Sequence, residues 1–202
     1  ARELSELDLS QEKEQALRAR EEKLAEEAAR LAGELSERRK KCAKRFIQKV
    51  EEELRELDMP SVRLTFSWAQ RPLSPQGGDE VELLISPNPG EEPKPLAKIA
   101  SGGEISRVML AIQNTLTQSD RELTMIFDEV DAGVSGRAAQ KIGRKLGQAA
   151  RQRQVLCVTH LAQVAAFADR HLLIAKQVEG GRTFTTLEPL DEAGRVEELV
   201  QA

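Results

Sequence analysis

Residues 1–58 constrain the fold more than any other stretch, because they contain no proline and only one glycine, Gly33. Apolar residues recur here at spacings of three, four and seven: Leu17, Leu24, Ala28, Leu31, Leu35 and Cys42. This repeat predicts one helix with a coiled-coil seam, about 87 Å long at 1.5 Å per residue. Such a helix cannot bury its seam alone, so a second, antiparallel coil strand is expected outside this sequence.

After Cys42 the apolar spacing drifts toward 3.6 residues, through Phe46, Val50 and Leu54. That period is typical of a helix packed on a globular body. The sequence therefore predicts a coiled-coil arm over 1–45 and a globular lobe over 46–202. We also expect the chain to be a piece of a longer polypeptide, because it begins inside the helical pattern without an initiator methionine.

In the predicted lobe, apolar residues first alternate with polar residues, as they do in strands. Patterns of helices and short apolar strands then follow in turn. Two strands, at 62–68 and 81–85, are predicted to flank a polar loop over 71–80, and a proline-rich connector follows. The remaining predicted elements are helices at 103–118, 136–150, 161–168 and 191–201, and strands at 123–128, 154–159, 171–177 and 182–190. This alternation predicts an α/β fold with a mostly parallel sheet covered by helices.

Composition excludes some classes of function. A net charge of −4 argues against nucleic-acid binding by the whole surface, although a local basic patch is compatible with it. Cys42 and Cys157 have neither metal-site nor disulfide spacing, which favours a reducing cytosol. No apolar run is long enough for a membrane span, so no membrane partner is expected.

The segment Ala100-Ser101-Gly102-Gly103-Glu104 precedes an amphipathic helix. Glycines there let backbone approach a ligand, and the N–H groups at a helix start favour an anion. An ordinary helix cap is the alternative, with Ser101 and Glu104 forming a capping box.

Two apolar strands end in polar side chains. Asp128 and Glu129 end the first, where Asp128 could support Mg²⁺ and Glu129 could polarise a water. His160 ends the second and could contact a phosphate. The alternatives are surface acids and a structural histidine. The intervening segment 130–136 has the composition of a turn in which Ser135 caps the next helix.

Taken together, the order and spacing of these segments resemble an ABC-type ATPase head. ASGGE resembles the signature, MIFDE the Walker B motif, DAGVSG the D-loop and VTH the switch histidine. The coil running into the head is similar to SMC-type proteins. The blocks PNPGEEPKPLAKIASGGEISRVMLA, IFDEVDAGVSG, VLCVTHLAQVAAFAD and LDEAGRVEEL, within residues 45–200, resemble the bacterial RecN family of DNA-repair ATPases.

The resemblance implies a role for each motif. ATP would lie between two heads, with Ser101, Gly102, Gly103 and Glu104 at the γ-phosphate of the partner's nucleotide. In its own head, Asp128 would support Mg²⁺, Glu129 would be the base, His160 would contact the γ-phosphate, and Asp131 would communicate across the dimer. Head dimerisation would engage or tether DNA ends during double-strand-break repair, in the bacterial cytoplasm or nucleoid. An ATP-gated structural tether and, less favoured because of the coil, a transporter subunit are the alternatives.

The chain has no G-x-x-x-x-G-K-[ST] segment and no Gly-Lys pair. The resemblance places that P-loop in an N-terminal lobe of the same polypeptide, so this chain alone is expected to hydrolyse almost no ATP. A basic cluster lies where coil meets head: Arg38, Arg39, Lys40, Lys41, Lys44 and Arg45. It could bind DNA phosphates, as SMC-type proteins do near this junction, or be a solvated helix face, which the nearby acidic residues favour.

Overall fold

The computed structural model describes residues 2–99, 101–116, 124–151, 153–179 and 181–201. The chain divides into two compact units. The first unit comprises residues 1–46 and 66–83, and the second comprises 47–65 and 84–202. The division of the sequence into an arm over 1–45 and a lobe over 46–202 stays a prediction.

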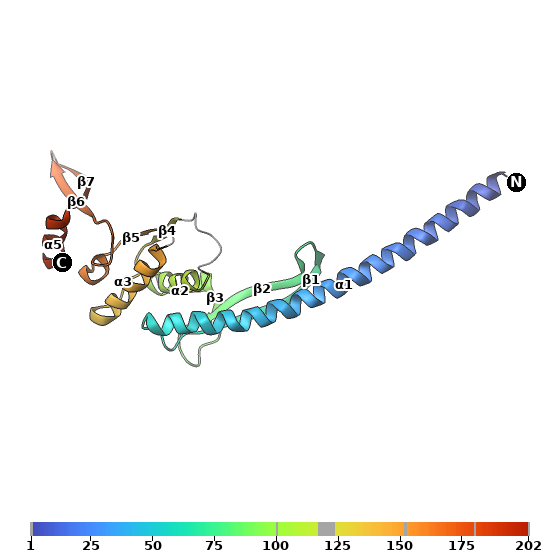
Figure 1. Ribbon diagram of the computed structural model, residues 1–202, viewed down its shortest axis with the longest axis horizontal. Helices are drawn as coiled ribbons and strands as arrows, with labels where there is room; N and C mark the ends of the chain where they lie inside the picture. The colour runs from blue at the N-terminus through green and yellow to red at the C-terminus, as the bar shows by residue number, and fades with distance from the viewer. Residues whose placement is uncertain (1, 100, 117–123, 152, 180, 202) are drawn as a thin grey trace. The chain divides into compact units, whose positions relative to one another are not determined.

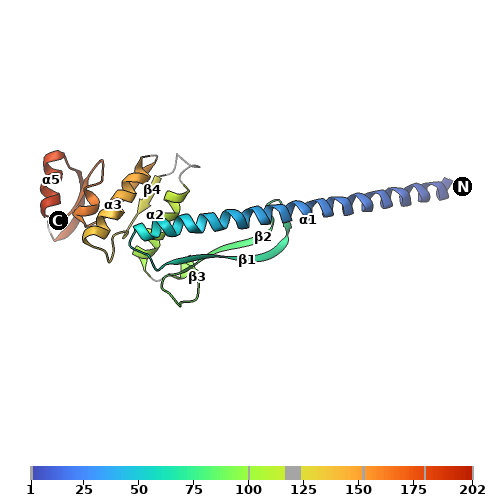
Figure 2. The ribbon, with the colours of Figure 1, turned by 60° about the horizontal axis from the view of Figure 1, so that its bottom comes forward.

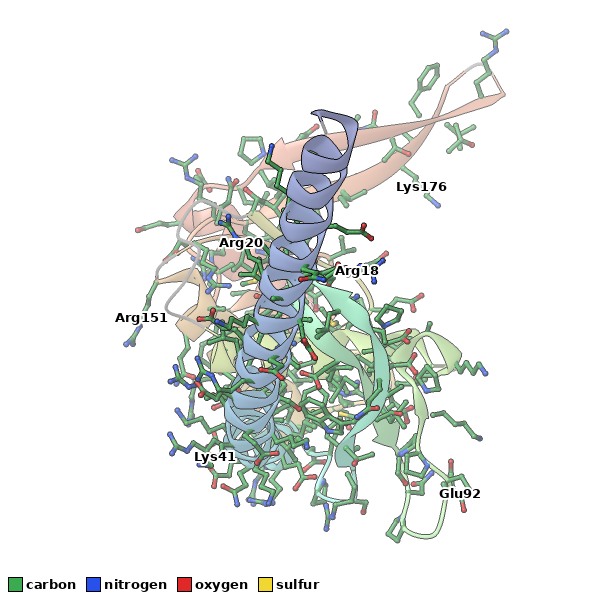
Figure 3. All side chains as sticks on the ribbon, turned by 90° about the vertical axis from the view of Figure 1, so that its right-hand side faces the viewer. Arg18, Arg20, Lys41, Glu92, Arg151 and Lys176 are labelled. Atoms are coloured by element: carbon green, nitrogen blue, oxygen red, sulfur yellow. The ribbon has the colours of Figure 1, made fainter. Side chains whose placement is uncertain are left out.

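A single helix, α1 (Arg2–Glu56), accounts for the proline-free stretch, as predicted. It ends where Met59 N–H donates to the Leu54 carbonyl at 2.9 Å and Asp58 takes a positive φ of 66°. The seam leucines are exposed, with Leu17 at 66% and Leu24 at 56%. No hydrophobic side chain described in the first unit is buried, so a second coil strand stays a prediction. Figure 3 looks along α1 and shows the charged side chains that project from it, Arg18 and Lys41 among them.

The predicted loop over 71–80 is wrong. Those residues belong to the ends of two long strands, β1 (Arg63–Ser74) and β2 (Gly77–Ser86), and only residues 75–76 connect them. The turn is closed locally, because the Ser74 hydroxyl donates to the Gly77 carbonyl at 3.0 Å and Gly77 has a φ of 92°. The polar residues lie on a ribbon exposed to solvent, so their polarity does not break the strands.

Within the first unit, the hairpin is packed along α1. Phe46 of α1 meets Phe66 of β1 with ring centroids 6.1 Å apart, and Phe66 meets Trp68 at 6.2 Å. Figures 1 and 2 both show β1 and β2 running beside α1. The short strand β3 (Lys94–Pro95) pairs antiparallel with β2, and η1 (Leu96–Lys98) follows it in the connector.

The second unit contains the alternating elements that the sequence predicts. They are α2 (Gly102–Thr115), β4 (Thr124–Phe127), α3 (Gly136–Ala150), β5 (Gln154–Cys157), α4 (Ala162–Ala165), β6 (Leu172–Glu179), β7 (Arg182–Pro189) and α5 (Glu192–Gln201). The predicted end of the helix beyond 116 and the start of the strand at 123 lie outside the described residues. The core combines residues from the end of α1, from α2 and from α3, including Leu54, Leu110 and Ile142, all fully buried.

The α/β class is confirmed, but the described strands do not form the mostly parallel sheet that was predicted: they lie in three small sheets, and β4 and β5 are the parallel pair. Their register joins Phe127 to Cys157, so the two strands end at the same level. The other described strands pair antiparallel, β2 with β3 and β6 with β7. Among the described residues, no helix has the length and apolar character needed to cross a membrane.

A buried lysine joins α3 to the end of α1 inside the second unit. The Lys145 side chain is 8% exposed, and its Nζ lies 2.8 Å from Glu53 Oε2 and 2.7 Å from Glu56 Oε2. Burial lowers the pKa of Lys145, but contact with the two carboxylates outweighs it and the net pKa is raised. The ammonium is therefore held charged between two acids from another helix.

Replacing this lysine is expected to loosen the junction. Lys145→Met fills the volume but leaves Glu53 unpaired, which should lower the free energy of unfolding by about 2 kcal/mol. Lys141→Met is the matched control on the same helix. Its Nζ is 3.5 Å from Asp58 Oδ1 in a half-exposed pair, so it should cost under about 1 kcal/mol. Urea titration of both variants measures the difference, and equal losses would contradict it.

The raised pKa of Lys145 also determines how the stability of the fold should change with pH. Stability from Lys145 should be complete below the ordinary lysine pKa and should disappear as the pH rises through the higher value in the folded protein.

Candidate functional site

The polar side chains predicted at two strand ends lie at the same edge of the β4–β5 pair. Asp128 and Glu129 follow β4, and His160 follows β5 by three residues. The parallel pairing continues past the strands, because Val158 N–H donates to the Phe127 carbonyl at 2.9 Å. All three side chains are exposed at this edge. Parallel sheets bind ligands at the carboxyl ends of their strands, so the placement suits a site.

Asp131 links the two strand ends from a buried position. It is 2% exposed, and its Oδ2 lies 3.6 Å from His160 Nδ1. The Thr159 hydroxyl donates to the same Oδ2 in a short hydrogen bond. Thr159 also accepts from Leu161 N–H at 3.1 Å, which fixes the backbone on the far side of His160. Asp131 thus faces its own chain, and its proposed role across a dimer stays a prediction.

The glycine-rich segment starts α2 beside this edge. Ser101 is the N-cap, and its hydroxyl accepts from Glu104 N–H at 3.4 Å, which is the Ser101 half of the predicted capping box. Ala100 lies outside the described residues. Ser135 occupies the N-cap position of α3, but its side chain makes no cap hydrogen bond. The Ser101 cap occupies the Glu104 N–H and leaves other N–H groups of the first turn available, so the cap does not exclude the predicted contact with phosphate.

Gly102 and Gly103 also make close contacts within their own chain, which were not predicted from the sequence. A Cβ on Gly102 would overlap Glu129 Oε2. A Cβ on Gly103 would lie 2.9 Å from both Glu129 O and Ala132 Cβ. The start of α2 is therefore packed directly on the turn that carries Glu129. At Gly103 the neighbours include main-chain oxygens, so only a residue without a side chain permits the approach, whereas at Gly102 the neighbour is the movable end of the Glu129 side chain.

Two further residues of α2 hold the same turn and were not predicted. The Ser106 hydroxyl donates to the Asp128 carbonyl at 2.8 Å. Arg107 Nη1 donates to the carbonyls of Val130 at 3.2 Å and Ala132 at 2.9 Å. A sequence signal existed for Arg107, since it lies four residues after Gly103 and three before Leu110, on the buried stripe of the helix.

The field at this edge is negative. Burial, followed by the charges of Asp131 and Asp128, raises the pKa of the Cys157 thiol to about 12. Cys157 therefore stays a protonated thiol, which makes it a poor nucleophile and metal ligand. Within the described ranges, no group of three or more His, Cys, Asp or Glu side chains could hold a metal ion by itself.

The hairpin of the first unit engages one residue of the predicted DNA cluster on α1. Arg39 Nη1 lies 3.1 Å from Asp79 Oδ2, and its Nη2 donates to the Gln76 carbonyl at 2.8 Å. Hydrogen bonding from Ser36, aided by Arg39, lowers the pKa of Asp79. Lys40 pairs with Glu37 at 3.1 Å. Five of the six residues are exposed and stay candidates for DNA: Arg38, Lys40, Lys41, Lys44 and Arg45.

Comparison of the sequence and the structure with known proteins identifies the family of this chain. No family model matches the chain. It is 45% identical over 194 residues to DNA repair protein RecN of Streptomyces coelicolor, covering 90% of this chain and 34% of that protein. It is 41% identical over 201 residues to the Bacillus subtilis RecN protein, covering 92% and 35%. This stretch of chain belongs to the RecN family.

The RecN relatives are much longer than the chain, which spans about a third of their length. Among solved structures, the Smc head domain with a coiled coil and joint from Pyrococcus yayanosii superposes with a TM-score of 0.50 at 20% identity. That match covers 77% of this chain and 28% of the archaeal one. It identifies the fold as that of part of an SMC-type head.

Proposed function

We propose that this chain is the signature-bearing lobe of the ATPase head of a RecN-type DNA-repair protein. The observation that carries the proposal is the convergence of Asp128, Glu129 and His160 at one edge of the β4–β5 pair, with the glycine-rich start of α2 packed on the same turn. Carboxylates and a histidine at strand ends suit phosphoryl transfer to water. Membership of the RecN family supports the link to DNA repair.

In the proposed mechanism each residue has one task. The Glu129 carboxylate orients and deprotonates the attacking water in its own head, and His160 donates to a γ-phosphate oxygen. Asp131 and Thr159 hold the His160 backbone in place. Ser101, Gly102 and Gly103 present N–H and O–H donors to the nucleotide of a second head.

Asp128 fits a role as one contributor to a Mg²⁺ shell, because carboxylate oxygen is a ligand that this cation prefers. The other ligands would have to come from the phosphates, from water and from the lobe that carries the P-loop. Bound Mg²⁺ would neutralise charge on the phosphates, and this negative edge favours a cation.

ATP turnover by the complete protein tests the proposal. Turnover per molecule should rise with protein concentration, because two heads complete each site, and linear duplex DNA should increase it. The 202-residue chain alone should be inactive. Adding the separately expressed P-loop lobe should restore some turnover. Hydrolysis by the chain alone, or turnover per molecule that is independent of protein concentration, would contradict the shared site.

A further inference from the structure

Arg107 is a buried cation that the mechanism above does not use. It is 7% exposed on α2, and burial lowers its pKa, opposed by the charges of Glu104, Asp131 and Asp58. Arginine stays charged in spite of such shifts. Its Nε has no hydrogen-bond partner among the described residues. Burying a guanidinium with one donor unpaired costs free energy. An arginine at position 107 therefore needs an explanation beyond the volume that its side chain fills.

What Arg107 holds is the turn between β4 and α3. Its Nη1 donates to the Val130 and Ala132 carbonyls, while Ser106 donates to the Asp128 carbonyl. Side chains of α2 thus grip three alternate carbonyls of one short loop. Glu129 lies between the first two, and Asp131 lies between the last two.

The backbone at Glu129 needs such support. Glu129 has a φ of 57°, in the left-handed region that residues other than glycine rarely adopt. Such a conformation costs about 1–3 kcal/mol and persists only where its surroundings enforce it. Ala132 N–H donates to the Glu129 carbonyl at 3.0 Å, which closes the turn but leaves the carbonyls on either side to α2.

We propose that Arg107 is a positioning residue for ATP hydrolysis, which holds the 128–132 turn so that the Glu129 carboxylate keeps its working orientation. The inference rests on the proposed function, in which Glu129 activates water. A base acts efficiently only at hydrogen-bond distance and in the right orientation, so a small displacement of the turn should slow chemistry more than it weakens ATP binding. The guanidinium donates to two carbonyls from Nη1, which a methionine of similar length cannot do because it has no N–H donor.

The test compares four variants of the complete protein: Arg107→Met, Arg107→Lys, Glu129→Gln and the double variant Arg107→Met with Glu129→Gln. Arg107→Met should lower kcat about tenfold or more and change ATP affinity less than about twofold. Arg107→Lys should recover part of the loss. The double variant should be no slower than Glu129→Gln alone, because Arg107 acts through Glu129. Arg144→Met, exposed on α3, removes a guanidinium as a control and should keep wild-type turnover.

Several outcomes would overturn the inference. Unchanged kcat in Arg107→Met refutes it, as does a parallel fall in kcat and ATP affinity that tracks the folded fraction. Losses that multiply in the double variant show that Arg107 acts independently of Glu129. If Arg107→Met does not fold, Arg107→Lys combined with Glu129→Gln makes the same comparison. Wild-type turnover in Glu129→Gln would instead refute the proposed function, whatever Arg107→Met does.

Discussion

Glu129→Gln in the complete protein is expected to lower ATP turnover at least about 100-fold while ATP binding persists. The amide keeps the shape of the side chain and can still donate to a water, but it cannot accept a proton. Glu129 is exposed at the edge of the β4–β5 pair, so the substitution removes no buried contact that supports the fold. Two heads should therefore close on ATP and fail to reopen, and the dimer should accumulate.

Size-exclusion chromatography with Mg²⁺ and ATP, together with single-turnover hydrolysis, measures both parts of this prediction. Glu92→Gln is the matched control, since Glu92 is an exposed carboxylate in the connector between β2 and β3 (Figure 3). It should behave as the wild type does. A Glu129→Gln protein that loses the dimer along with the turnover would count against the role of water activation and favour a role in head contact.

Gly103→Ala is expected to have a similarly large effect through a different cause. The new Cβ would lie 2.9 Å from the Glu129 carbonyl oxygen and 3.2 Å from the Ala132 carbonyl oxygen. These oxygens belong to the main chain and cannot move aside as the end of a flexible side chain can. The start of α2 and the turn must therefore move apart. We expect turnover to fall about 100-fold. The free energy of unfolding should fall by about 1–3 kcal/mol.

Gly33→Ala provides the control for this substitution. Gly33 lies in the middle of α1, and a Cβ there meets nothing within 4 Å. Alanine favours the helix over glycine, so this variant should gain about 0.5–1 kcal/mol and keep its turnover. Urea titration and steady-state ATP hydrolysis of both variants check the pair. Normal turnover in Gly103→Ala would mean that the close approach of α2 to the turn is not needed for activity.

The sequence predicted the order of elements well because most of them carry a periodic pattern of their own. The heptad leucines predicted α1, and apolar runs ending in Asp128 and His160 predicted β4 and β5. It failed at residues 71–80, where glycine, proline and polar residues suggested a loop. A two-stranded ribbon exposed to solvent tolerates those residues, and nothing in a local pattern reports that the hairpin will extend along a helix.

Composition and spacing alone therefore determined the long helix, the α/β class and the placement of polar residues at the ends of β4 and β5, because these depend on neighbours in the chain. Tertiary structure alone decided how Asp131 is used, since its carboxylate meets Thr159, 28 residues later, from a buried position. It also decided the roles of Gly103, Arg107 and Lys145. Each of these makes its contacts with a segment distant in sequence, and only the packing of α2 on the turn and of α3 on α1 brings those segments within reach.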